Sequence, residues 1–119
     1  GLPKGSEQEK AARTEAIQEA TRYAIEIPFR VMKKSFETME ILKTMAETGN
    51  PNSVSDAGVG ALAARSAVMG AFLNVKINAA GLNDKAFVAS VIAEGTEIER
   101  NAKLMEEQIL EIVNHKINA

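Results

Sequence analysis

The polar run from Gly49 to Asp56, GNPNSVSD, holds the first side chains that can do chemistry. Its amides, hydroxyls and single carboxylate come where a helix is expected to begin, and free backbone N–H groups there favour anionic or carbonyl groups of a ligand. Asp56 can act as a general base or hydrogen-bond a ring nitrogen. Local sequence alone favours a simpler interpretation, in which the run is a turn and Ser53 or Ser55 caps the helix.

A second candidate group lies near the end of the same expected helix. Asn74 and Asn78 are four residues apart and share a helix face, where their amides can read the edges of a heterocycle. Alternatively, Asn78 is a C-cap and Asn74 a satisfied buried residue. Arg65 follows Asp56 by nine residues and should lie on the opposite side of the helix, so the two should not pair. Arg65 could bind a carboxylate or form a salt bridge with a neighbour, and we favour the salt bridge. His115 is expected to be exposed.

Long helices must position these groups. A capping box at Ser6–Glu9 predicts that the first helix begins at Ser6 and runs to Thr48. Pro28 removes a backbone donor, so a kink or restart is expected there. Gly49 is the expected left-handed stop.

Two further helices are predicted after this turn. The second covers about residues 54–77, and the last runs from Asn83-Asp84 to about Lys116. Four heptad pairs in the last helix, at 88/91, 95/98, 102/105 and 109/112, predict a narrow packing seam. No strand pattern occurs, so the fold class is all-α, a bundle of long helices. Six large side chains are expected in its core: Met32, Phe36, Met39, Met69, Phe72 and Met105.

The second helix carries small residues on every face, and Arg65 is its only charge between Asp56 and Lys76. A helix without a polar face is normally buried all round, and each glycine inside it costs about 1 kcal/mol relative to alanine. We therefore expect other polypeptide to cover its open faces, either a second copy or a missing segment of the same gene product. The last helix, about 50 Å long at the helical rise per residue, should overhang a compact domain.

Composition limits the possible functions. The 119 residues carry 14 basic and 16 acidic side chains, a net charge of −2, with one His, no Cys and 19 alanines. Disulfides, thiolate zinc sites, cysteine nucleophiles and two-histidine metal motifs are thereby excluded. The near-neutral charge argues against a nucleic-acid surface, and without a run of about 18 apolar residues no membrane segment is expected. We expect one soluble domain of the cytoplasmic type.

Three blocks of this chain resemble the cyclodeaminase/cyclohydrolase family, which contains the cyclodeaminase domain of formiminotransferase-cyclodeaminase and stand-alone methenyltetrahydrofolate cyclohydrolases. The blocks are LPKG at 2–5, GNPNSVSDAGV at 49–59 and NVKIN at 74–78, and the likeness runs from about residue 2 to residue 114. The second and third blocks together are specific, whereas either alone is a weak signal.

The resemblance implies an all-helical homodimer that binds a tetrahydrofolate derivative and needs no metal. The reaction would convert 5-formiminotetrahydrofolate to 5,10-methenyltetrahydrofolate and ammonia, as in histidine degradation, or interconvert the methenyl and 10-formyl forms. Carried over to the matching positions, Asp56 would be catalytic, and the substrate-binding residues would be Asn50, Asn52, Ser55, Asn74 and Asn78.

The family pattern also contains earlier helices and a proline- and glycine-rich loop, which nothing in this sequence matches. Together with the initial Gly in place of Met, this predicts that residues 1–119 are the C-terminal half or somewhat more of one domain, inactive alone. Partners would then include the missing N-terminal half and a formiminotransferase domain. The competing hypothesis is a non-catalytic helical assembly module, for which the heptad seam and alanine-rich faces suffice.

Overall fold

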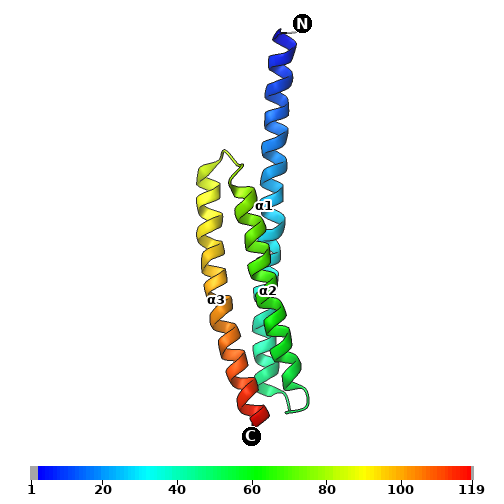
Figure 1. Cartoon of the computed structure of the whole chain (residues 1–119), viewed down its shortest axis with the longest axis vertical. Coiled ribbons are helices and arrows are strands. Elements are labelled where there is room, and N and C mark those ends of the chain that lie inside the picture. Colours follow the sequence, from blue (N-terminus) through cyan, green and yellow to red (C-terminus); the bar gives the residue numbers. More distant parts are fainter. Residues whose placement is uncertain (1–2, 119) are drawn as a thin grey trace.

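The computed structural model describes the backbone of residues 3–118 and the side chains of residues 5–118, so Leu2 of the first block lies outside the described residues. Three helices follow one another: α1 (Pro3–Thr48), α2 (Val54–Ala79) and α3 (Lys85–Asn118). They run side by side as an elongated bundle of 78 × 21 × 16 Å (Figure 1). The all-α prediction is confirmed.

Helix α1 differs from its prediction at both ends and in the middle. It begins at Pro3, so Ser6 lies within the helix and no capping box forms there. It continues through Pro28 without a restart, because contacts with the other helices support the turn that the proline weakens. Gly49 is not left-handed; its N–H makes one more helical bond, to the Met45 carbonyl at 2.8 Å, and α1 ends at Thr48 without a positive φ.

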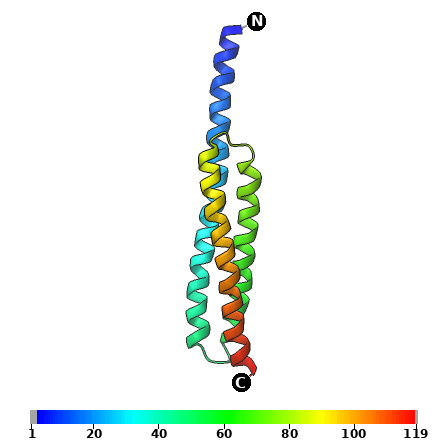
Figure 2. The ribbon, with the colours of Figure 1, turned by 90° about the vertical axis from the view of Figure 1, so that its left-hand side faces the viewer.

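The overhanging segment belongs to α1 and not, as expected, to the last helix. Both views show α1 extending beyond the turn that joins α2 to α3 (Figures 1 and 2). Residues from Glu7 to Ile17 are accordingly exposed. Helix α3, at 34 residues, instead lies alongside α2 and the second half of α1.

The seam of α3 forms as predicted. Val91, Gly95, Ala102 and Ile109 are buried, and their heptad partners are half-buried beside them. Asp84 caps the helix, since its Oδ1 accepts from the Phe87 N–H at 3.1 Å. Local periodicity and capping therefore place this element correctly.

The core consists of two clusters along the bundle. The larger one is centred on Phe72, Ile25, Met32 and Met39, all fully buried. The smaller one comprises Ala46, Val54, Ala57, Ala61, Ile109 and Val113, next to the turn between α1 and α2. Of the predicted core side chains, Met69 is the exception, because it lies exposed on α2.

Helix α2 is not buried all round. It packs one face against α1 and α3, while large apolar residues on its other face are exposed. By length and composition α2 could also cross a membrane, a test that soluble core helices pass as well. No membrane segment is expected from the sequence, because that expectation requires an uninterrupted apolar run. Arg65 and Asn74 interrupt the apolar residues of this helix.

Candidate functional site

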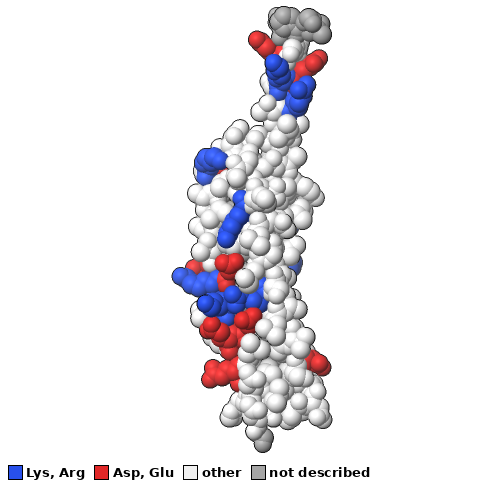
Figure 3. Space-filling view, viewed as in Figure 1, with Lys and Arg blue, Asp and Glu red and all other residues white. Residues whose placement is uncertain are grey.

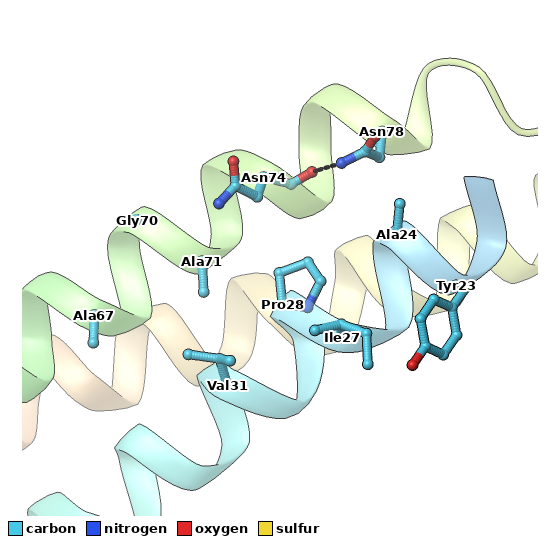
Figure 4. A pocket seen from close by; sticks show the side chains of 10 residues that line it. All are labelled: Tyr23, Ala24, Ile27, Pro28, Val31, Ala67, Gly70, Ala71, Asn74 and Asn78. Carbon is cyan, nitrogen blue, oxygen red and sulfur yellow. Dashed lines mark hydrogen bonds between the residues drawn. The ribbon is translucent and has the colours of Figure 1, made fainter. Parts of the chain in front are cut away.

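An open groove of about 690 Å³ runs between α1 and α2 (Figure 4). Its walls are mostly apolar, and small residues of α2 make one side shallow. The polar side chains on α2 are two asparagines at one end, while the Tyr23 hydroxyl points away from α2. From α1 the lining residues are Tyr23, Ala24, Ile27, Pro28 and Val31, and from α2 they are Ala67, Gly70, Ala71, Asn74 and Asn78.

Pro28 gives this groove a polar group that the sequence reasoning missed. Its ring faces α2 across the groove. Because proline has no N–H, the carbonyl of Ala24, four residues earlier, loses its usual helical donor. Ala24 and Pro28 both line the groove, so an acceptor without its helical partner lies at its wall. The signal was present in the sequence, since a proline inside a helix always frees the carbonyl four residues before it.

The two predicted asparagines do lie together. The Asn78 Nδ2 donates to the Asn74 backbone carbonyl at 2.8 Å, which leaves the Asn78 Oδ1 as an acceptor. Asn74 is exposed at the groove and not buried, and the C-cap of α2 is Ala80 and not Asn78. Both simpler alternatives for these residues are therefore wrong in detail. The pair offers amide donors and acceptors at one end of an apolar surface.

The other predicted group forms the turn between α1 and α2. The Asn50 Oδ1 accepts from the N–H groups of Asn52 and Ser53 at 3.0 and 3.1 Å. The Ser53 hydroxyl donates back to Asn50, so Ser53 makes no side-chain cap although it occupies the N-cap position. Asn50 therefore stabilises the turn, as expected if the run from Gly49 to Asp56 is simply a turn between two helices. Asn52 and Ser55 are exposed beside it.

Lys116 fixes this turn from the end of α3, a contact that sequence reasoning missed. Its Nζ donates to the carbonyls of Ala46 and Glu47 at 2.6 Å and of Gly49 at 3.0 Å. A cation at a helix C-terminus is favourable because the unpaired carbonyls carry partial negative charge. The lysine was recognisable as a basic residue in the last turn of its own helix. It instead completes the C-terminus of α1.

Asp56 lies in the first turn of α2, exposed and next to the positive end of the helix dipole. The residue is 18 positions before Asn74 in one unbroken helix, so the two lie about 27 Å apart along the axis. General acid–base catalysis needs contact within about 3 Å, directly or through one water. Within one chain, the structure therefore does not bring the proposed catalytic carboxylate to the asparagine pair.

Arg65 behaves as predicted. Its Nη1 lies 3.2 Å from the Glu106 Oε1 of α3, and both side chains are less than a fifth exposed. The ion pair ties α2 to α3 on the side away from the groove. His115 is exposed, also as predicted.

The comparisons with known proteins agree with the sequence blocks. The model of the family described as formiminotransferase-cyclodeaminase matches residues 1–97. A methenyltetrahydrofolate cyclohydrolase of Methylorubrum extorquens is 40% identical over 118 residues, covering 99% of this chain and 57% of its own length. A formimidoyltransferase-cyclodeaminase of Dictyostelium discoideum is 37% identical over 116 residues, covering 98% of this chain and 21% of its own length.

The chain thus spans just over half of the first relative and about a fifth of the second. A formimidoyltransferase-cyclodeaminase of Rattus norvegicus is 35% identical over 86 residues, 72% of this chain and 16% of its own length. Such identities over nearly the whole chain, together with the family model, leave one assignment. The chain belongs to the formiminotransferase-cyclodeaminase family.

Proposed function

We propose that the full-length gene product containing this chain acts on a one-carbon derivative of tetrahydrofolate, and that the groove between α1 and α2 binds the heterocycle. The observation that carries the proposal is the asparagine pair at one end of an apolar groove. Relatives named as a cyclohydrolase and as cyclodeaminases support the class of reaction.

The groove suits a flat ring with polar edges. Ala67, Gly70 and Ala71 offer a surface without protruding side chains, against which a planar ring can lie. Asn74 supplies both an amide donor and an acceptor, and the freed Ala24 carbonyl supplies a further acceptor on the opposite wall. A pterin presents both N–H donors and ring acceptors at its edge, so this set of groups matches it chemically.

Two related reactions fit the family. In the deaminase, N10 adds to the formimino carbon on N5, and the C–NH₂ bond of the resulting tetrahedral carbon then breaks to release ammonia. In the cyclohydrolase, water adds to the methenyl carbon, and the bond to N5 breaks to give the 10-formyl form. Each reaction removes a proton from the entering group and returns one to the leaving nitrogen. We assign this proton transfer to Asp56, a carboxylate that forms no ion pair with the described residues 5–118.

The finer assignments extend this proposal. The deaminase would work in the cytoplasm on formimino groups from histidine degradation, with a formiminotransferase domain as partner, and as a homodimer. The cyclohydrolase would need no such partner. Formation of methenyltetrahydrofolate from the formimino substrate, against its loss by hydrolysis, separates the two reactions by the methenyl absorbance.

The test is a titration of the full-length protein with a reduced folate, followed by calorimetry, together with the absorbance assay. We expect saturable binding that weakens in Asn74→Ala. Asp56→Asn should lower turnover by about 100-fold or more, the usual contribution of a general acid–base group. Glu107→Gln, an exposed carboxylate on α3, is the matched control and should leave turnover unchanged. Turnover as in the wild type for Asp56→Asn would remove Asp56 from the mechanism.

An assembly module without catalysis is the second candidate, favoured by the exposed apolar residues of α2. It predicts association of the chain without any binding of reduced folate. The same titration decides between the candidates, because a protein that associates but shows neither folate binding nor turnover is a module.

A further inference from the structure

The C-terminal end of α3 lies beside the turn between α1 and α2, at the end of the bundle opposite the overhang of α1 (Figures 1 and 2). From there the Lys116 Nζ donates to three backbone carbonyls, those of Ala46, Glu47 and Gly49. A lysine ammonium has three N–H donors, so this contact uses all of them. The lysine is half-buried, and it lies beyond residues 1–97, the part that the family model matches.

These carbonyls need a donor from elsewhere in the chain. The last carbonyls of α1 have no helical partners, and the Gly49 carbonyl lies just past the helix end. The Glu47 carbonyl would continue the helix with the N–H of residue 51, but Pro51 has none. On the face in Figure 3, the visible basic side chains of the described residues lie in the upper and middle parts of the molecule, above this end. Lys116 therefore completes a helix end that neither the local sequence nor another basic side chain of that face completes.

We propose that Lys116 is a positioning residue for Asp56, a role that rests on the proposed function. A path of short links joins the two residues. The carbonyl carbon of Gly49, whose oxygen Lys116 holds, is bonded directly to the Asn50 nitrogen. The Asn50 carbonyl accepts from the Ser53 N–H at 3.1 Å, and the Ser53 carbonyl accepts from the Asp56 N–H at 3.1 Å. A shift at the end of α1 is therefore passed to the backbone that carries the carboxylate.

The first turn of α2 is the part of the site that depends on this contact. Ser53 provides no side-chain cap, so the first N–H groups of α2 rely on the carbonyls of the preceding turn. The body of α2 is held separately, since Ala61 is fully buried in the smaller core cluster with Ile109. Loss of Lys116 should therefore loosen the first turn, which carries Asp56, while the bundle stays folded.

The groove lies far from the Lys116 contact. Asn74 is 18 residues after Asp56 in the same helix, about 27 Å along its axis. A catalytic group misplaced by about 1 Å can lose on the order of 100-fold in rate, whereas the walls of a groove at that distance keep their shape. Lys116 should thus affect the rate of turnover and leave the affinity for folate unchanged.

The first experiment measures turnover and affinity of the full-length protein in parallel. Lys116→Met removes the cation and keeps a long unbranched side chain. We expect kcat, from the methenyl absorbance, to fall by about 10- to 100-fold, while the Kd for tetrahydrofolate, from calorimetry, stays within about 2-fold of the wild-type value. Lys116→Arg keeps the cation and should recover part of the lost turnover. Lys103→Met, at an exposed lysine of the same helix, is the matched control and should change neither quantity.

Three results of this experiment would overturn the proposal. The first is a wild-type kcat in Lys116→Met. The second is an equal loss of kcat and affinity, because it would show that Lys116 only stabilises the folded protein. The third is a Lys116→Arg protein as slow as Lys116→Met, because the cation would then not be the group that matters.

The second experiment asks whether Lys116 acts through Asp56. In the Asp56→Asn protein the carboxylate to be positioned is absent. Adding Lys116→Met should therefore lower the remaining turnover by less than about 2-fold, since residues that act as a unit are not additive. A loss as large as that in the wild-type background would overturn the link between the two residues.

The third measurement needs no folate. Amide hydrogen exchange, followed by mass spectrometry, reports local opening of the turn. In Lys116→Met the exchange of residues 49–56 should become faster by about 10-fold or more, while residues 79–84 in the other turn keep their wild-type rates. Unchanged exchange at 49–56 would overturn the proposal at its first step. A full-length wild-type protein that neither binds nor converts folate, with faster exchange in Lys116→Met, would instead remove the proposed function and, with it, the positioning role.

Discussion

Replacing Pro28 should make the protein more stable and, under the proposed function, weaken the binding of folate at the same time. Pro28 lies well inside a continuous 46-residue helix, where a proline costs about 3 kcal/mol relative to alanine. Pro28→Ala restores the N–H that bonds to the Ala24 carbonyl. The free energy of unfolding should therefore rise by about 2–3 kcal/mol, less the contacts that the ring makes at the groove wall.

The same restored bond should affect the groove. If the Ala24 carbonyl accepts a hydrogen bond from the ligand, occupying it with the new N–H costs about 0.5–1.5 kcal/mol, or roughly 2- to 13-fold in affinity. Urea unfolding followed by circular dichroism measures the first effect, and calorimetric titration with a reduced folate measures the second. Pro28→Gly is the matched variant, because it restores the same N–H but is about 1 kcal/mol less favourable in a helix than alanine.

Pro28→Ala and Pro28→Gly should therefore differ in stability and agree in affinity. Unchanged affinity in both variants would refute the use of the Ala24 carbonyl. A loss of stability in Pro28→Ala would refute the view that the proline weakens α1, and would mean that the helix packs around its ring.

Three further predictions concern the packing that holds the site. In Gly95→Ala the new Cβ would lie 2.5 Å from the buried ring of Phe72, so overpacking of about 1–3 kcal/mol should cancel or exceed the gain in helix propensity, as urea unfolding will measure. Lys116→Met removes the cation from the end of α1 and should cost about 1.5–3 kcal/mol, with faster proteolysis in the turn at 49–53 as the readout. Arg65→Met leaves the largely buried Glu106 carboxylate without its ion-pair partner and should lower the free energy of unfolding. Adding Glu106→Leu should restore part of this loss, as a double-mutant cycle will measure.

The elements that were predicted correctly from the sequence are held by interactions between residues that lie close together along the chain. The seam of α3 follows from a repeat of three and four residues, and the Asp84 cap bonds to an N–H three residues away. The turn at Asn50 also closes on its own next residues. In each case the interacting groups lie within a few positions, so residue type and spacing nearly determine the contact.

The features that sequence missed depend on distant partners. Lys116 reaches carbonyls 67 to 70 residues earlier in the chain, and nothing local marks it as their donor. The continuity of α1 through Pro28 likewise depends on packing that local rules do not contain. Asp56 and Asn74 were assigned to one site from matching blocks, although the helix predicted over about residues 54–77 already placed them at opposite ends of one element, as α2 does.

The composition of α2 follows from the different contacts around its circumference. Gly58 lets α3 approach, since an added Cβ would meet Val113 at 3.3 Å, and Gly60 lets α1 approach, since a Cβ would meet Leu42 at 2.8 Å. A Cβ added at Gly70 would meet no atom within 4 Å in this chain. Close packing against α1 or α3 therefore does not explain this glycine, which costs the helix about 1 kcal/mol relative to alanine. Gly70 instead lines the groove, where the lack of a side chain leaves the flat surface on which the proposed ring would lie.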